Sequence, residues 1–134
     1  PAGFNGDIHL VSQIREWEKT HPELQSLMIG HASVANPAIF REARGGAPAS
    51  GEELAAFHDA LMADYAAAFG SIGNTVGHMK QYWFYMKNMF EGGEKLFKQL
   101  LKTKNVSDYE SLVQEIATTL PIRTEPAYGW WKPV

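Results

Sequence analysis

The sequence has no cysteine among its 134 residues, which excludes a disulfide scaffold, a thiolate zinc site and a thiol nucleophile within these residues. It also has no apolar run that approaches the ~20 residues of a membrane span, and no signal peptide opens it. The length is too short for a complete (β/α)8 barrel of ~250 residues, although it suffices for a domain with a hydrophobic core. These absences are compatible with a cytoplasmic protein that has no membrane partner.

Basic residues are in slight deficit, and the net charge of −3 argues against indiscriminate binding to nucleic acid. The lysines are nevertheless unevenly distributed. The window from His78 to Lys104 contains six lysines and two glutamates, so it has a net charge of +4 and the remainder carries −7. This contrast indicates either a surface for a polyanion or an ordinary solvated helical face, and both interpretations stay open on charge alone.

The first 45 residues alternate between short strands and helices. Asn36-Pro37 predicts a helix start, because asparagine caps free N–H groups and proline is tolerated at the first helical position. Gly30 ends a short apolar run that is typical of a buried strand. The expected elements are the end of a strand in residues 1–7, a helix from Ile8 to Pro22, a strand over residues 24–29 and a helix over residues 38–43.

The rest of the chain predicts helices only. Two S-x-x-E capping boxes, Ser50 with Glu53 and Ser107 with Glu110, indicate two of the helix starts. Apolar residues recur at helical spacing in four segments, which favours an antiparallel four-helix arrangement over residues 46–120 with an irregular tail over residues 121–134. The predicted apolar faces are Leu54, Phe57, Leu61, Tyr65 and Phe69; Ile72, Val76, Met79, Trp83, Met86 and Phe90; Leu96, Phe97, Leu100 and Leu101; and Leu112, Val113, Ile116 and Leu120.

No motif in the chain predicts free-standing catalysis or a metal site. The histidines show no H-x-x-x-H spacing, and the one E-x-x-H, from Glu18 to His21, is single, whereas a di-iron bundle needs two. His9, His21 and His58 are therefore interpreted as surface or packing residues. The sequence also lacks a G-x-S-x-G nucleophile elbow and a P-loop, so no catalytic residue is assigned.

Two glycine-containing turns each lie between a predicted strand and a predicted helix. They are Asn5-Gly6-Asp7 and Gly30-His31-Ala32-Ser33. Glycine lets the backbone approach a ligand closely, and the helix that follows directs N–H groups toward it. Adjacent turns of this kind form the phosphate site of many (β/α)8 enzymes. The alternative is a pair of ordinary βα turns, in which glycine is common.

Three segments in this order resemble a known family. FNGDI, then MIGHASVANPAIFRE, then HMKQYWFYMKNMF are similar to the C-terminal part of the tRNA-dihydrouridine synthases, over roughly residues 3–118. The resemblance implies a mainly α chain in which residues 1–45 are the last βα units of a truncated TIM barrel that binds flavin. Residues 46–120 would form a helical tRNA-binding domain, and the tail over residues 121–134 is not covered.

The resemblance also assigns cofactor-binding residues. Asn5, Gly6 and Asp7 match the turn after the seventh barrel strand, near the phosphate of FMN, and Gly30 and His31 match the second phosphate turn. The family usually has arginine where this chain has His31. Backbone N–H donors are unaffected by that exchange, but a fixed cation beside the phosphate is lost near neutral pH.

The helical segment carries the residues that the resemblance assigns to tRNA. Lys80 matches a recurrent basic position of the family, and the neighbouring candidates are His78, Lys87, Lys98 and Lys102. Their implied role is contact with phosphates, which positions an RNA without reading its sequence. The resemblance therefore favours the polyanion interpretation of the lysine window.

The family reduces the C5–C6 bond of uridine in tRNA with FMN, which NADPH reduces, and a cysteine from an earlier barrel loop acts as general acid. That segment is not in this chain, which we expect to begin inside the seventh strand as a fragment. We expect it to supply part of the FMN site and a tRNA-binding domain, and to be inactive alone. The alternatives are a stand-alone helical RNA-binding module and a helical protein-interaction module.

Overall fold

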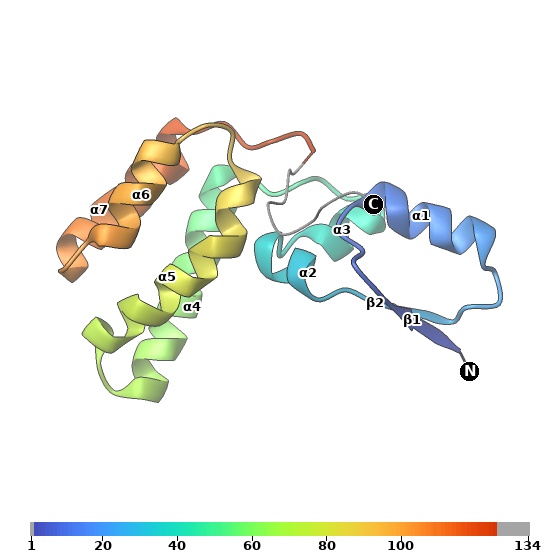
Figure 1. The fold of residues 1–134 in the computed structure, drawn as a ribbon, viewed down its shortest axis with the longest axis horizontal. Helices are drawn as coiled ribbons and strands as arrows, with labels where there is room; N and C mark the ends of the chain where they lie inside the picture. Colours follow the sequence, from blue (N-terminus) through green and yellow to red (C-terminus); the bar gives the residue numbers. More distant parts are fainter. Residues whose placement is uncertain (1, 126–134) are drawn as a thin grey trace.

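A computed structural model describes residues 2–125, and the fold of this part is mainly helical (Figure 1). Strands and the first helix lie at one end, the last four helices gather at the other, and two short helices lie between them. The elements are β1 (Gly3–Asn5), α1 (Val11–Thr20), β2 (Ser26–Met28), α2 (His31–Ala35), α3 (Ile39–Ala43), α4 (Gly51–Phe69), α5 (Ile72–Met86), a 3-10 turn (Lys87–Met89), α6 (Glu94–Lys102) and α7 (Val106–Thr119).

The two strands pair in parallel, with α1 as the connection between them. Helix α1 begins at Val11, so the prediction that it begins at Ile8 is wrong. The reason is local: the Gln13 side chain accepts hydrogen bonds from the N–H groups of His9 at 2.8 Å and Leu10 at 3.0 Å. These bonds satisfy the donors ahead of the helix, and Ile8 enters the smaller core from an extended segment.

Helix α2 follows β2 directly and was not predicted. Five residues are too few to show a helical period in sequence. Asn36 is the residue at which α2 ends, and the predicted helix over residues 38–43 follows it as α3. The predicted capping by Asn36 is also present. The Asn36 Oδ1 atom accepts from the N–H of Ala38 at 3.1 Å, just before α3.

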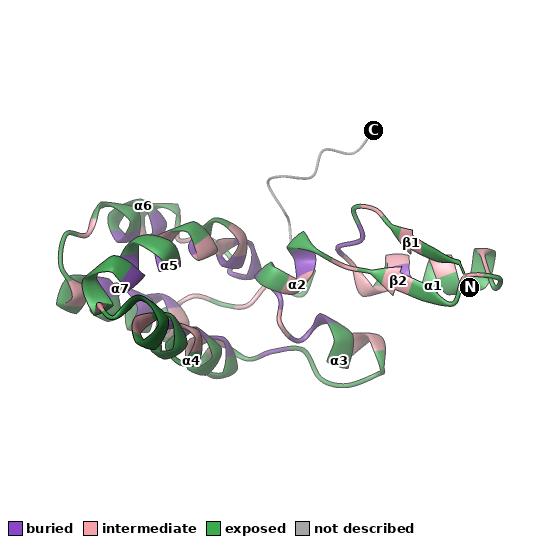
Figure 2. Ribbon diagram, turned by 90° about the horizontal axis from the view of Figure 1, so that it is seen from below, coloured by how far each residue is buried: buried purple, intermediate pink, exposed green. Residues whose placement is uncertain are grey.

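Helix α4 buries a different face from the predicted one. Leu54, His58 and Met62, each four residues apart, are buried, whereas Phe57 is 41% exposed. Figure 2 shows α4 exposed along most of its length. The polar ring of His58 can occupy the core because both its nitrogens have hydrogen-bond partners, the buried Tyr109 and the exposed Asp59, as buried polar groups require.

Other helical predictions are confirmed. The Ser50 side chain accepts from the N–H of Glu53 at 3.1 Å and caps α4. The predicted stripe of α5 is buried from Val76 to Met86, although that helix ends at Met86 rather than at the glycines. The larger core cluster joins residues of α4, α5, α6 and α7. Helix α7 differs at its start, where Asn105 and not Ser107 accepts from the N–H of Asp108, at 2.8 Å.

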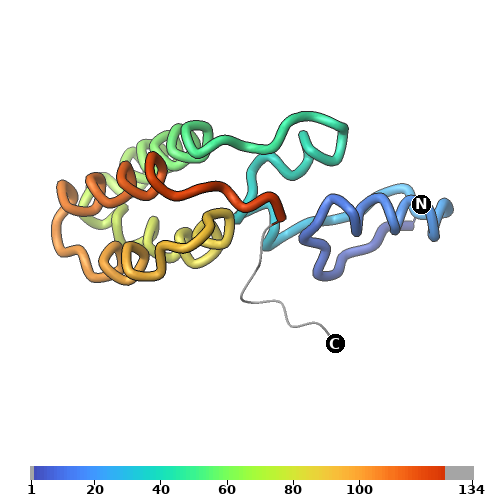
Figure 3. Tube along the Cα trace, turned by 90° about the horizontal axis from the view of Figure 1, so that it is seen from above, coloured from blue at the N-terminus to red at the C-terminus, as the bar shows by residue number. Residues whose placement is uncertain are grey.

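The segment after α7 returns to the end of α5, as Figure 3 shows. Ile122 forms an isolated antiparallel bridge with Phe90, and the Arg123 side chain donates to the Phe90 carbonyl oxygen at 2.9 Å. The first residues of the predicted irregular tail therefore close the helical core. Trp130 and Trp131 lie outside the described residues.

Candidate functional site

The two predicted turns lie side by side. Parallel pairing places Asn5 opposite Met28, so β1 and β2 reach the same edge of the sheet at their carboxyl ends. The turns that follow line one pocket of about 640 Å³. All five predicted cofactor-binding residues are among its lining residues: Asn5, Gly6, Asp7, Gly30 and His31.

The first turn is held by its own backbone. The N–H of Ile8 donates to the Gly6 carbonyl oxygen, and the His9 ring donates from Nδ1 to the Asp7 carbonyl oxygen at 2.8 Å. His9 is buried beneath the turn, in agreement with its interpretation as a packing residue. This arrangement fixes the path of the chain around Asp7, whose carboxylate is the only acidic group among the lining residues.

The second turn presents the start of α2 to the same pocket. The N–H groups in the first turn of a helix have no intrahelical acceptor, and His31 and Ala32, which begin α2, line the pocket. A Cβ at Gly30 would meet no atom within 4 Å. The described chain therefore does not crowd the backbone at Gly30, and a ligand can approach it closely.

Tyr85 is the lining residue that the turn motifs did not predict. It belongs to α5, and its ring stacks on the His31 ring with centroids 5.5 Å apart and planes 13° apart. Tyr85 also lines a second pocket of about 560 Å³ between α5 and α6. One side chain thus separates the turn pocket from the helical pocket.

The structure brings two of the five predicted RNA-binding residues together. Lys80 and Lys87 both line the pocket between α5 and α6. The Lys80 Nζ donates to the Thr103 carbonyl oxygen at 2.6 Å, so this ammonium group also caps the end of α6. The Lys87 Nζ lies 5.2 Å from the ring centroid of Phe84.

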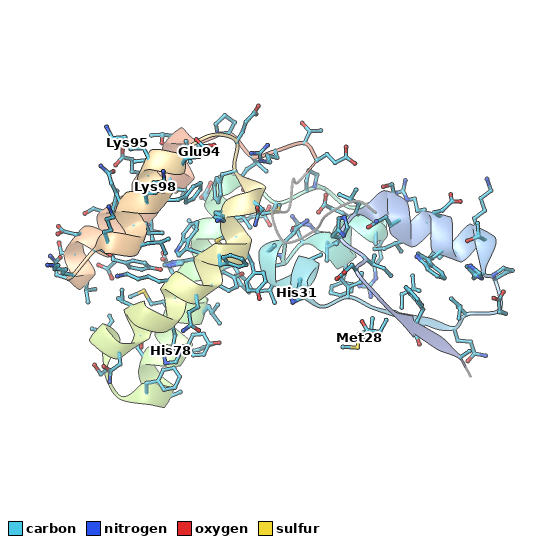
Figure 4. The ribbon with its side chains drawn as sticks, viewed as in Figure 1. Met28, His31, His78, Glu94, Lys95 and Lys98 are labelled. Atoms are coloured by element: carbon cyan, nitrogen blue, oxygen red, sulfur yellow. The ribbon has the colours of Figure 1, made fainter. Side chains whose placement is uncertain are left out.

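The other three predicted residues lie elsewhere on the helices. Lys98 and Lys102 are exposed on α6 and do not line that pocket. His78 stacks on Phe69 of α4 with centroids 4.4 Å apart. Figure 4 shows His78 near the turn that joins α4 to α5, away from Lys98. The predicted residues therefore form separate groups rather than one patch.

Helix α5 has a uniformly positive or neutral surface. No aspartate or glutamate occurs between Tyr65 and Phe90. The ionisable cationic groups of α5 are therefore His78 and Lys80, and Lys87 follows in the 3-10 turn. The ion pairs within residues 2–125 join histidine or arginine to a carboxylate, and none of them includes a lysine. The positive charge of this surface is thus not neutralised by neighbouring side chains in the described part of the chain.

A third polar group, around Tyr109, lies inside the helical core. The Trp83 Nε1–H donates to the Tyr109 oxygen at 3.0 Å, and the Tyr109 hydroxyl donates to His58 Nε2 at 2.7 Å. The His58 Nδ1–H then donates to Asp59 at 3.0 Å. Burial lowers the pKa of His58, although Asp59 and Glu110 oppose the shift, and burial raises the pKa of Tyr109.

The Tyr109 hydroxyl of this group has no access to a substrate. Tyr109 is 0% exposed, and both of its polar partners are buried side chains of the core. The Asp59–His58–Tyr109 order resembles a proton relay, but a hydroxyl enclosed in this way cannot reach a reacting atom. The group therefore fixes how α4, α5 and α7 pack against one another.

Within residues 2–125, no group of three or more histidine, aspartate or glutamate side chains could hold a metal ion. The helices of the same part include none that is long and apolar enough to cross a membrane. Comparisons with protein-family models, with curated proteins and with solved structures gave no match. The two pockets and the charges around them are the features of the described chain that bear on its function.

Proposed function

We propose that this chain is the C-terminal part of a flavin-dependent tRNA-dihydrouridine synthase, with the last βα units of a TIM barrel followed by an antiparallel four-helix domain. In the complete enzyme, uridine of tRNA is reduced to 5,6-dihydrouridine with FMN and NADPH. One observation carries the proposal. Residues of two turns that are far apart in sequence line a single pocket at the carboxyl ends of parallel strands, which is where barrel enzymes bind phosphate.

The donors of this pocket fit the phosphate end of FMN. Backbone N–H groups at the start of α2 and the ring of His31 would hold the phosphate, and Gly30 leaves room for it. Two features weaken the fit. Asp7 brings a negative charge to the same pocket, and His31 is a cation only when it is protonated. We therefore expect the purified chain to hold FMN weakly and to be colourless.

FMN, when bound, supplies the hydride for reduction of the base. The residues of this chain would bind and orient that cofactor and hold the RNA, and they include no cysteine to act as the general acid. We therefore expect the 134-residue chain to reduce no uridine by itself.

The tRNA part of the proposal is tested by binding of unmodified tRNA at several salt concentrations. Lys87 is the best position, because it lines the helical pocket, whereas Lys80 also supports α6. Lys87→Ala is expected to weaken binding and to lower the salt slope by about one, as for the loss of one phosphate contact. Lys19→Ala, an exposed lysine of α1, is the matched control and should change neither quantity.

Measurements of tRNA binding and FMN binding separate this proposal from two alternatives. A helical protein-interaction module is favoured by Phe84 and Leu101, which are each 53% exposed beside the helical pocket. Absence of tRNA binding at low salt would support that module and contradict the RNA proposal. A stand-alone RNA-binding module would bind tRNA but would show no saturable binding of FMN at the turn pocket.

A further inference from the structure

The pocket between α5 and α6 combines an apolar floor with a positive rim. Trp83, Phe97 and Leu100 are buried residues of the helical core that line it. Lys80 and Lys87 line it as well, and no carboxylate is among its lining residues. A pocket with these walls suits a ligand that has both a flat apolar part and a negative charge.

Phe84 is the exposed aromatic residue of this pocket. Its side chain is 53% exposed, although an aromatic ring is normally buried in a helical core. Tyr85 holds the ring in an edge-to-face arrangement, with centroids 5.3 Å apart and planes at 87°. The Lys87 Nζ lies 5.2 Å from the same ring. A positioned ring beside an ammonium group can stack on a nucleobase while the cation binds the attached phosphate.

We propose that this pocket binds one unpaired nucleotide of RNA, with the base stacked on Phe84 and the phosphate bound by Lys87. The proposal rests on the tRNA-binding function proposed above and specifies which part of the RNA this pocket binds. A base inside a duplex has both faces covered by its neighbours, so only an unstacked base can lie against a protein ring. The ligand is therefore a loop, a bulge or a single-stranded end.

The size of the pocket favours a nucleotide over a helical peptide. Its volume of about 560 Å³ is typical of a site for a small molecule. A helix that docks in a groove needs a row of apolar anchors over two turns. Only Phe84 and Leu101 are large exposed apolar residues among the lining residues of this pocket. An acidic helical peptide would thus find matching charge here but too short a groove.

The experiment compares a fluorescent oligouridine with an RNA duplex of the same length, by anisotropy, on the full chain. Phe84→Leu keeps an apolar side chain but removes the aromatic face, and Phe84→Trp keeps it. Phe40→Leu is the matched control, since Phe40 is 45% exposed on α3 and does not line the pocket. Thermal unfolding of each variant confirms that the fold is retained.

Phe84→Leu is expected to weaken oligouridine binding by about fivefold to a hundredfold, the range measured for the loss of one base–ring stack. Phe84→Trp and Phe40→Leu should bind as the wild type does, and duplex binding should change little. Oligouridine binding that is unchanged in Phe84→Leu overturns the nucleotide pocket while the tRNA proposal stands. If the wild type binds no RNA at all, both proposals are wrong. Displacement of oligouridine by an acidic helical peptide whose own binding survives Phe84→Leu also overturns the nucleotide assignment.

Discussion

Replacing Tyr109 with phenylalanine tests the polar group in the helical core most directly. The hydroxyl accepts from Trp83 Nε1–H at 3.0 Å and donates to His58 Nε2 at 2.7 Å. All three side chains are buried, with Tyr109 0% exposed. The variant leaves a buried N–H donor and a buried ring nitrogen acceptor without these partners.

The size of the effect follows from those two groups. A buried polar group that loses its partner costs about 1–3 kcal/mol, so the two together lower the free energy of unfolding by roughly 2–6 kcal/mol. The apolar part of the ring is unchanged, and packing contributes little to the difference. A loss of this size is a large fraction of the 5–15 kcal/mol that is typical of a whole domain.

Tyr82→Phe is the matched control. The Tyr82 hydroxyl is also buried, but it has no hydrogen-bond partner among the described residues, and burial raises its pKa. Removing that hydroxyl abolishes an unsatisfied group, so the variant should be as stable as the wild type or slightly more stable. Urea unfolding followed by far-UV circular dichroism measures both. A free energy of unfolding for Tyr109→Phe within about 0.5 kcal/mol of wild type, the spread of ordinary surface substitutions, would show that the two hydrogen bonds do not stabilise the core. An equal loss in both variants would show the same.

Three other measurements address the caps, the buried histidine and the turn pocket. Because burial lowers the pKa of His58 in the folded state, the unfolded state takes up the proton more readily, and the free energy of unfolding should fall as pH drops below 6.5. Urea unfolding of His58→Gln should lack this part of the pH dependence. The same pH dependence in the variant and the wild type would contradict the role of His58. Asn105→Ala should lower the free energy of unfolding by about 1 kcal/mol, whereas Ser107→Ala should cost less, and equal losses would show that the cap of α7 is misassigned. His31→Arg should tighten FMN binding, measured by quenching of flavin fluorescence, since it adds a fixed cation; unchanged affinity would argue against a phosphate at this turn.

Local signals in the sequence were sufficient for part of the fold. The Ser50 cap depends on a donor three residues away, and the stripe of α5 depends on a regular period, so both were predictable. The buried face of α4 was not, because His58 enters the core through a partner 51 residues later in the chain. Helix α2 was missed for the opposite reason, since its five residues are too short to show a period.

The candidate site was also predictable only in part. The proximity of the turns at Gly6 and Gly30 could be predicted, because the carboxyl ends of neighbouring parallel strands meet at one edge of a sheet. The place of Tyr85 depends on how α2 packs against α5, and nothing in the local pattern records that packing. The bond from Lys80 to Thr103 is likewise a long-range contact. It gives a supporting role to a lysine that the family resemblance assigned to tRNA.

The position of Tyr85 couples unfolding of the turn pocket to unfolding of α5. A sheet of two short strands is marginal by itself in water, and the smaller core includes few buried residues. Tyr85 packs against that core although it belongs to the helix at the centre of the larger one. We therefore expect the two turns to lose their arrangement when α5 unfolds, because the smaller core then loses the packing of Tyr85.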